Sequence, residues 1–298
     1  MRPRVSVLIP TLEAERHLER LLPALAAQRV AGGLELRVLD SGSSDRTREL
    51  ALAAGAQVET IARAAFRHGP ARNRLAAGAL GDVLVFLSQD ALPEGEDFVA
   101  RLAAALDDPR TAAAYARLLP REDDDPLTAR TVLAAPEARA EPRLHESDDA
   151  ALAFHDIASA IRADALRALP FPDVAFGEDL AWARAALDRG WRIRYAADAV
   201  ARHAHRYGLR SAFERWRVDA AFHRTQTGRR VRPSVWSVAR GLGHELAADV
   251  AFLARRRALV STHLVRAPFL RGAQVIGQYF GSRGWNPGSG VAATRRLR

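Results

Sequence analysis

Residues 83–90 read Val-Leu-Val-Phe-Leu-Ser-Gln-Asp, and this stretch indicates the class of fold. Five consecutive apolar residues followed by a polar turn are typical of a strand that is buried on both faces of a sheet. Helices must then cover both faces. Asp90 is expected at the carboxyl end of this strand, which is where open α/β sheets bind their ligands.

The sequence before and after this strand alternates between strand and helix patterns. Further strands are expected at 4–9, 34–39 and 56–61. Helices are expected over 18–25, up to residue 54, and over 68–79 and 96–106. Such alternation predicts a mostly parallel, Rossmann-like sheet with right-handed crossovers and helices on its faces.

The second half of the chain changes character. Residues 119–150 are rich in proline and charge, which predicts a long loop or lid. A helix is then expected at 164–169, another at 178–189 and a strand at 191–195. Beyond residue 210, arginine-rich helical patterns continue to about residue 280, and the tail from Gly284 is expected to be loose.

The composition is that of an ordinary globular protein and excludes several kinds of chemistry. The 298 residues (32.5 kDa) include no cysteine, and all 44 basic residues are arginine. Disulfide bonds, thiolate nucleophiles, lysine Schiff bases and the lysine of a P-loop are therefore excluded. Any metal must be held by carboxylate, imidazole or substrate oxygens. The first residues do not resemble a signal peptide, and no apolar run reaches the ~18 residues of a spanning helix, which predicts a cytoplasmic protein.

Charge is unevenly distributed along the chain. Residues 1–198 carry a net charge of −6 and residues 199–298 one of +15. The basic C-terminal third is expected to face a polyanion, either nucleic acid or an anionic membrane surface such as the inner face of the plasma membrane. A basic, amphipathic pattern at 253–257 and 269–280 favours the membrane. The alternatives are a solvated basic surface and a helical bundle packed on the catalytic domain.

Acidic residues, rather than a glycine-rich loop, are the candidates for phosphate and nucleotide chemistry. The chain has neither a GxGxxG nor a GxxxxGK[ST] motif. Asp40 and Asp90 each end a predicted strand, where one could accept hydrogen bonds from a nucleoside and the other could hold a divalent cation that bridges two phosphates. Aspartate at a strand end is also a common turn former, so each residue alone is a weak signal.

Blocks of sequence from residue 4 to about residue 210 resemble the family 2 glycosyltransferases of the GT-A fold, and among them the rhamnosyltransferase-like members. The blocks are Val5-Ser-Val-Leu-Ile-Pro-Thr11, Val38-Leu-Asp-Ser-Gly-Ser-Ser-Asp45, Phe66-Arg-His-Gly-Pro-Ala-Arg-Asn73, Phe86-Leu-Ser-Gln-Asp-Ala91, Phe154-His-Asp-Ile-Ala-Ser-Ala-Ile-Arg162, Pro170-Phe171, Glu178-Asp179 and His203-Ala-His205. Each block is ordinary by itself, but their order and spacing are specific.

The resemblance implies a GT-A catalytic domain over 1–210 and a basic helical region over 211–298. The domain would comprise a nucleotide-sugar half at about 1–118, the variable loop 119–150 and an acceptor half at about 150–210. The implied activity is inverting transfer of a sugar, with rhamnose expected, from a dTDP- or UDP-sugar to a hydroxyl of a glycan or of a lipid-linked acceptor. No nucleic acid is expected as a partner.

The resemblance also implies site residues. Nucleotide contacts would come from Pro10, Thr11, Glu13, Asp40 and Arg72. Donor and acceptor contacts would come from His68, Gly69, Asn73, Gln89 and Asp156. The arginine among the nucleotide contacts can pair with a diphosphate through two parallel hydrogen bonds, although a surface arginine is the alternative.

The implied metal site has fewer carboxylates than the family pattern. The Asp-x-Asp motif is reduced here to Ser88-Gln89-Asp90, which leaves one carboxylate to bind Mg²⁺ or Mn²⁺. His203 and His205, two residues apart, would point to the same face of a strand and could complete the metal shell. A packed or solvated histidine is the alternative for each.

The implied catalytic residues are Asp179, as general base, and its neighbour Glu178. An aspartate at this position would accept the proton of the acceptor hydroxyl as its oxygen attacks the anomeric carbon. The alternative is that both acids only stabilise the start of a helix through its dipole.

Two other functions use similar features. A sugar nucleotidyltransferase would share the α/β sheet, but it needs a glycine-rich basic signature after the first strand, where residues 10–15 are acidic instead. A nucleic-acid-binding protein would explain the net charge of +9, although no recognised nucleic-acid module is present.

Overall fold

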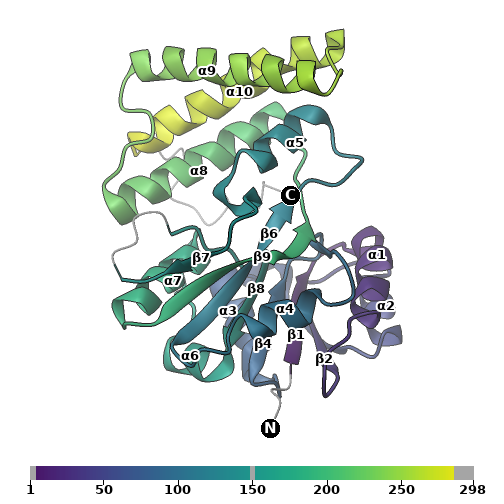
Figure 1. The fold of residues 1–298 in the computed structure, drawn as a ribbon. Helices are drawn as coiled ribbons and strands as arrows, with labels where there is room; N and C mark the ends of the chain where they lie inside the picture. Colours follow the sequence, from purple (N-terminus) through teal and green to yellow (C-terminus); the bar gives the residue numbers. More distant parts are fainter. Residues whose placement is uncertain (1–4, 148–151, 285–298) are drawn as a thin grey trace. The chain divides into compact units, whose positions relative to one another are not determined.

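The chain folds into two units, which we describe separately (Figure 1). The structure, a computed structural model, describes residues 5–147 and 152–284. The first unit comprises Met1–Leu119, Ala135–Val174 and Glu178–His203. The second comprises Pro120–Ala134, Ala175–Gly177 and Ala204–Arg298. The domain boundary expected at residue 210 remains a prediction.

A mixed sheet forms the centre of the first unit. Within the described residues it has nine strands in the order β3-β2-β1-β4-β8-β6-β9-β5, with β7 paired to β9. The strands are β1 Val5–Thr11, β2 Leu34–Asp40, β3 Gln57–Thr60, β4 Val83–Leu87, β5 Leu92–Pro93, β6 Thr111–Leu119, β7 Arg143–His145, β8 Ala158–Arg162 and β9 Arg192–Arg202. The first four are parallel neighbours, as expected, but β8 runs antiparallel to both β4 and β6.

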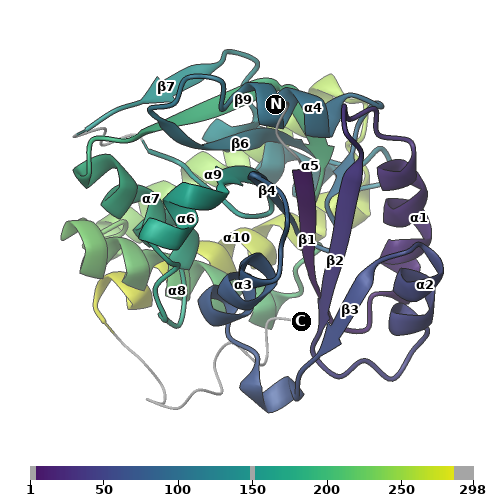
Figure 2. The same cartoon turned by 90° about the horizontal axis from the view of Figure 1, so that it is seen from below.

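Alternation along β4 explains why the sheet is covered on both faces. Val83, Val85 and Leu87 pack in one apolar cluster, and Leu84 and Phe86 pack in a second. The first cluster includes residues of α1 (Glu15–Ala26), α2 (Thr47–Ala53) and α4 (Phe98–Ala104). The second includes residues of α3 (His68–Ala77), α6 (Ala163–Ala168) and α7 (Glu178–Asp188). Figure 2 shows α1 and α2 on one side of β1 and β2 and α3 on the other.

The segment expected to be a long loop contains regular structure. It holds α5 (Pro126–Leu133), the short 3-10 helix η2 (Pro136–Ala138) and β7, and α5 belongs to the second unit. Asp125 caps α5 because its side chain accepts hydrogen bonds from the backbone N–H groups of Leu127 and Thr128, and Pro126 occupies the first helical turn. The strand expected at 191–195 is also longer and continues to Arg202 as β9.

Three long helices make up most of the second unit, which confirms the helical C-terminal extension. They are α8 (Leu209–Thr227), α9 (Val235–Arg255) and α10 (Ser261–Ser282), and α10 packs against both others. In the described part of the chain, none of the helices combines the length and apolarity needed to cross a bilayer. The tail that we expected to be loose lies, from residue 285, outside the described residues.

Glycines let α10 approach the backbone of α8. A Cβ atom at Gly277 would lie 2.4 Å from the carbonyl oxygen of Phe213, and one at Gly281 would lie 2.1 Å from that of Arg217. Since neither contact leaves room for a methyl group, these two glycines set the spacing between the helices.

We therefore expect Gly277→Ala to lower the free energy of unfolding by about 1–3 kcal/mol, because α8 and α10 must move apart. Gly272→Ala, on the same helix, is the matched control, since no heavy atom lies within 4 Å of its added Cβ. It should be neutral or stabilise the protein by up to about 1 kcal/mol, because alanine favours the helix. Urea unfolding followed by circular dichroism measures both; equal effects would contradict the close packing.

Candidate functional site

The carboxyl ends of β1 and β2 form one hydrogen-bonded edge around Asp40. This side chain is fully buried and accepts hydrogen bonds from the Thr11 hydroxyl (3.2 Å), the Gly42 N–H (3.1 Å) and the Ser43 N–H (2.9 Å) and hydroxyl (2.5 Å). Gly42 adopts a left-handed φ of 88°, which favours glycine. Asp40 thus fixes the turn that follows β2, and its nucleoside contact remains a prediction.

Glu13 extends this edge after β1. Its backbone has a left-handed φ of 47°, and its N–H donates to the hydroxyl of Ser43 at 2.8 Å. Its exposed carboxylate accepts the N–H of Ser44 at 3.0 Å. Pro10 lies half-buried in β1. Two loops that the sequence separates by about thirty residues are therefore bound to each other at the predicted nucleotide edge.

Gln89 joins β4 to the same edge. Its side-chain amide exchanges two hydrogen bonds with the backbone of Leu12, which donates at 2.8 Å and accepts at 3.1 Å. The structure thus brings together the candidate site residues at the carboxyl ends of β1, β2 and β4. The donor-sugar contact proposed for Gln89 remains a prediction, since both ends of its amide bind the chain itself.

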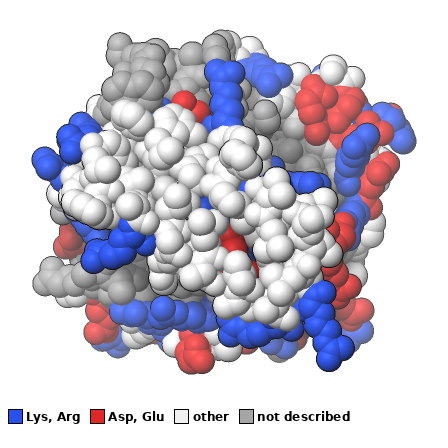
Figure 3. Space-filling view, turned by 90° about the horizontal axis from the view of Figure 1, so that it is seen from above, with Lys and Arg blue, Asp and Glu red and all other residues white. Residues whose placement is uncertain are grey.

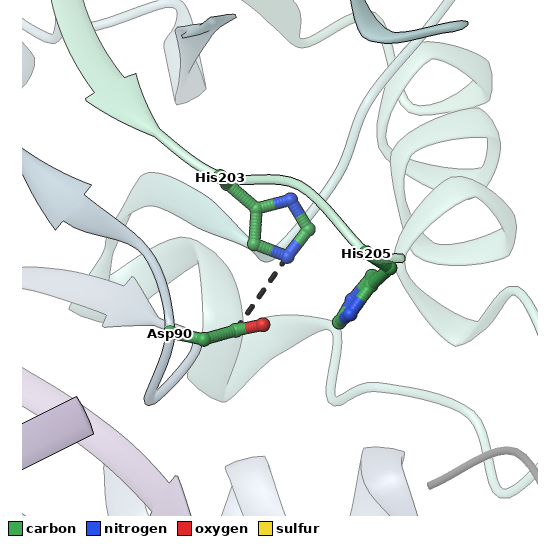
Figure 4. Close-up of side chains that lie close together, drawn as sticks. All are labelled: Asp90, His203 and His205. Atoms are coloured by element: carbon green, nitrogen blue, oxygen red, sulfur yellow. Dashed lines mark ion pairs between the residues drawn. The ribbon is translucent and has the colours of Figure 1, made fainter. Parts of the chain in front are cut away.

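Asp90 and His203 face each other at the end of the first unit (Figure 4). Nε2 of His203 lies 3.5 Å from Oδ1 of Asp90, and both side chains are largely buried. His203 follows the end of β9, where its N–H donates to the carbonyl of Leu119 at 2.9 Å. His205, two residues further along the chain, is exposed. The two histidines therefore lie after the strand and not within it, so the strand alternation that we used to pair them does not apply.

The donor atoms of this cluster fit a divalent cation. Asp90, His203 and His205 can each offer one ligand atom, and these atoms all lie within 4.8 Å of one another. Ligand atoms placed about 2.1 Å from one ion are themselves roughly 3 to 4 Å apart, which agrees with the Asp90–His203 spacing. Carboxylate oxygen and imidazole nitrogen are donors that first-row divalent metals accept. Three protein ligands would leave positions for phosphate oxygens.

A second cluster places a single arginine among three acids. Arg72 comes from α3 and is almost fully buried; its guanidinium donates to the Glu178 carboxylate, and its Nε lies 3.4 Å from Asp156. Asp179 follows Glu178 in the first turn of α7 and accepts the N–H of Asp156 at 3.4 Å. Asp156 also accepts the hydroxyl of Ser159 at 2.8 Å. The diphosphate contact predicted for Arg72 remains untested, but its guanidinium is already paired here.

Burial disfavours the ionised form of the two aspartates in this cluster, although Arg72 supplies a compensating charge. Burial, together with the nearby Asp179, raises the pKa of Asp156 to about 7, although Arg72 opposes the rise. Burial and then Glu178 also raise the pKa of Asp179 above its ordinary value.

The segment from His68 to Asn73 holds the turn that leads into α7. The Asn73 amide exchanges two hydrogen bonds with the backbone of Phe171, donating to its carbonyl at 2.9 Å and accepting its N–H at 3.0 Å. A Cβ atom at Gly69 would lie 2.3 Å from the carbonyl oxygen of Pro172, so only glycine permits this approach. His68 packs edge-on against Phe66. These residues hold the segment that precedes α7, and their donor contacts remain predictions.

His155 was missed by sequence reasoning. It is buried, its Nε2 bonds to the carbonyl of Ala116 at 3.1 Å, and burial together with His203 lowers its pKa to about 3. His155 therefore lies near both clusters: His203 of the first cluster affects its pKa, and the next residue in the chain, Asp156, belongs to the second. Nothing in the local sequence distinguishes it from an ordinary core histidine.

Comparison with known proteins finds a family, curated relatives and solved structures. The model of the family described as "Glycosyl transferase family 2" matches residues 6–169. The chain is 30% identical to the O-antigen chain rhamnosyltransferase RfbN of Salmonella typhimurium over 74% of this chain and 72% of that protein. It is also 30% identical to the O-antigen chain rhamnosyltransferase WbaN of Salmonella anatum, over 63% of this chain and 62% of that protein.

A solved structure with a similar fold is the mannosyltransferase PcManGT of Pyrobaculum calidifontis, in complex with GDP-Man and Mn²⁺. The two chains share a TM-score of 0.62 and 22% identity, over 92% of this chain and 87% of the other. At this identity the likeness concerns the fold.

The acidic cluster predicts a specific dependence of stability on pH. Since the pKa of Asp156 is higher in the folded chain than in the unfolded one, the folded state holds more protons between about pH 4 and 7, and the free energy of unfolding falls as pH rises through this window. Asp156→Asn should remove that fall and so gain, relative to the parent, on the order of 1 kcal/mol between about pH 5 and 8. Exposed Asp164→Asn is the control and should change in parallel with the parent in urea unfolding. Parallel curves for Asp156→Asn as well would show that Asp156 is ionised throughout.

Proposed function

The chain belongs to glycosyl transferase family 2, and on that premise we propose that it transfers rhamnose from a nucleoside-diphosphate donor to a hydroxyl of a glycan or of a lipid-linked acceptor. Membership makes the chain a glycosyltransferase that uses a nucleotide-sugar, and it decides against a nucleotidyltransferase or a nucleic-acid-binding protein. The observation that carries the proposed mechanism of transfer is the Asp179 carboxylate, held at the start of α7 beside a buried arginine.

The choice of rhamnose follows from the curated relatives. Both are named as rhamnosyltransferases of the O-antigen chain, which supports a growing polysaccharide as the acceptor. A dTDP- or UDP-sugar is the donor that we propose. The edge formed by Thr11, Glu13 and Asp40 would contact the nucleoside, with Pro10 beside them.

Asp179 would act as general base. Its carboxylate would take the proton of the acceptor hydroxyl while that oxygen forms a bond to the anomeric carbon. The bond from this carbon to the diphosphate oxygen breaks at the opposite face, and the electron pair leaves with the nucleoside diphosphate. One displacement inverts the anomeric centre. A raised pKa makes this carboxylate a stronger base than an ordinary aspartate, and Arg72 keeps it available in ionised form by opposing the rise.

Asp90, with His203 and His205, would hold Mg²⁺ or Mn²⁺. The ion would supply positive charge to the diphosphate as negative charge develops on it. Gln89 and the segment containing His68, Gly69 and Asn73 would line the donor side. Asp156 would face the acceptor side.

We also propose that the protein works in the cytoplasm, peripherally bound at the inner face of the plasma membrane. The excess of arginine over acidic residues after residue 198 supports this location, because that leaflet is anionic. A lipid-linked acceptor would be presented at the same surface.

Replacing the base tests the mechanism. Asp179→Asn should lower kcat by about 10²–10⁴ while nucleotide-sugar affinity stays near that of the parent, because the amide keeps the shape but cannot take a proton. Asp188→Asn, on the exposed end of the same helix, should keep the parent rate. Release of nucleoside diphosphate in the presence of acceptor measures both. Undiminished turnover in Asp179→Asn would remove this residue from its role.

A thermal-shift panel tests the donor and the metal together. Since a ligand that binds only the folded state raises Tm, dTDP-rhamnose with Mn²⁺ should raise it more than GDP- or UDP-hexoses do, and chelation of the metal should reduce the shift. Asp90→Asn should lose most of the metal-dependent part. Asp97→Asn, an exposed acid paired with Arg101, should retain it. A panel in which no donor shifts Tm would contradict the proposed function.

A further inference from the structure

Two helices of the second unit expose an apolar surface that the fold leaves uncovered. Trp236 is 85% exposed on α9, and Val265 and Phe269 are 64% and 63% exposed on α10. Other large apolar side chains exposed on these helices and on the turn between them are Val235, Val250, Leu259, Val260, Leu264 and Ile276. We call this set the α9–α10 face. Figure 3 looks onto it: uncharged side chains fill most of the middle, and arginine and acidic side chains lie towards the margin.

The acidic residues of these helices are turned away from the face. Asp249 is almost fully buried, where it pairs with Arg271 at 2.8 Å and with Arg130. Glu245 also pairs with Arg130 and is only 17% exposed. Among the described residues of α9 and α10, no Asp or Glu is classed as exposed. Negative charge is therefore neutralised inside the unit.

Positive charge, in contrast, stays outside. Arg255, Arg256 and Arg257 are exposed where α9 ends, directly before exposed Leu259 and Val260. Arg240 is exposed on α9. A large apolar surface of this kind on a folded unit indicates a binding surface, and its basic border indicates an anionic partner.

We propose that the α9–α10 face lies in the interface of an anionic bilayer, with its apolar side chains among the acyl chains and its arginines at the lipid headgroups. This inference deepens the peripheral membrane location proposed above and rests on it. The helices would lie along the surface, since they are not apolar enough to span it. Trp236 suits such a position because indole favours the boundary between hydrocarbon and water.

Charge argues against the other occupants. A second copy bound through the same face would bring the exposed arginines of α9 together, and the described residues of α9 and α10 include no exposed acid to pair with them, because a two-fold contact joins identical surfaces. Nucleic acid calls for positive charge and polar contacts across the middle of the surface, and this middle is apolar.

The test is sedimentation of the full chain with vesicles of phosphatidylcholine alone or mixed with phosphatidylglycerol. We expect binding to the anionic vesicles at low salt. Trp236→Ser combined with Phe269→Ser should weaken it about tenfold or more, because both apolar contacts are lost. Replacing Arg255, Arg256 and Arg257 by serine should remove the preference for the anionic lipid. Leu52→Ser combined with Leu80→Ser is the matched control, since these residues of the first unit are 60% and 59% exposed, and it should bind as the parent does.

Three results would overturn the proposal: no binding of the parent at low salt, undiminished binding of the Trp236 and Phe269 variant, or a dimer in analytical ultracentrifugation that this variant converts to monomer. Circular dichroism and melting verify that each variant is folded. Sugar transfer is assayed with a soluble acceptor, so the proposed function is tested independently of membrane binding. Transfer without vesicle binding removes the membrane surface alone, and vesicle binding without transfer from any donor removes the proposed function alone.

Discussion

The buried contact between Arg72 and the acids around it is the constraint on which the rest of the site depends. Removing one guanidinium would leave Glu178, Asp156 and Asp179 in a region of low polarity with no compensating charge, and an unpaired buried charge is strongly unfavourable. The contact joins α3, α7 and the segment before β8. Through these elements the contact links parts of the first unit that are far apart in the sequence, so its loss would disturb the candidate site and the folding of the unit together.

Much of the fold follows from the chemical character of short segments. The five apolar residues of β4 predict a strand covered on both faces, and the two apolar clusters confirm it. The alternation of strand and helix likewise predicts that Thr11 and Asp40 meet at one edge, because parallel strands end on the same side. A strand at 158–162 was not predicted, and the antiparallel position of β8 between β4 and β6 depends on contacts between segments far apart in the chain. Asp125 and Pro126 are residue types that often begin a helix, but the prediction of a loop over 119–150 gave them no such role.

In the candidate site, too, local sequence predicts which residues take part but not the contacts between distant segments. Asp90 and Asp179 were selected by motif, and the structure gives each an environment that suits its proposed role. The charged groups around Asp179 could not be predicted from the sequence. Arg72 and Glu178 are 106 residues apart, and no local spacing predicts that they pair. For the same reason Arg72 was assigned only to a diphosphate. The two histidines were paired on the assumption that both lie in a strand. Both follow Arg202, the last residue of β9, so the path of the chain after the strand decides where they point.

The two hydrogen bonds between Asn73 and the backbone of Phe171 span 98 residues of sequence. They tie α3 directly to the segment that precedes α7, so this contact does not depend on the length of the chain between them. Because closing a longer surface loop adds little free energy, the exposed turn at 122–123 can lengthen while Asn73 and Phe171 keep their contact. Such an arrangement lets evolution insert sequence between α3 and α7 without moving the segment that leads into α7.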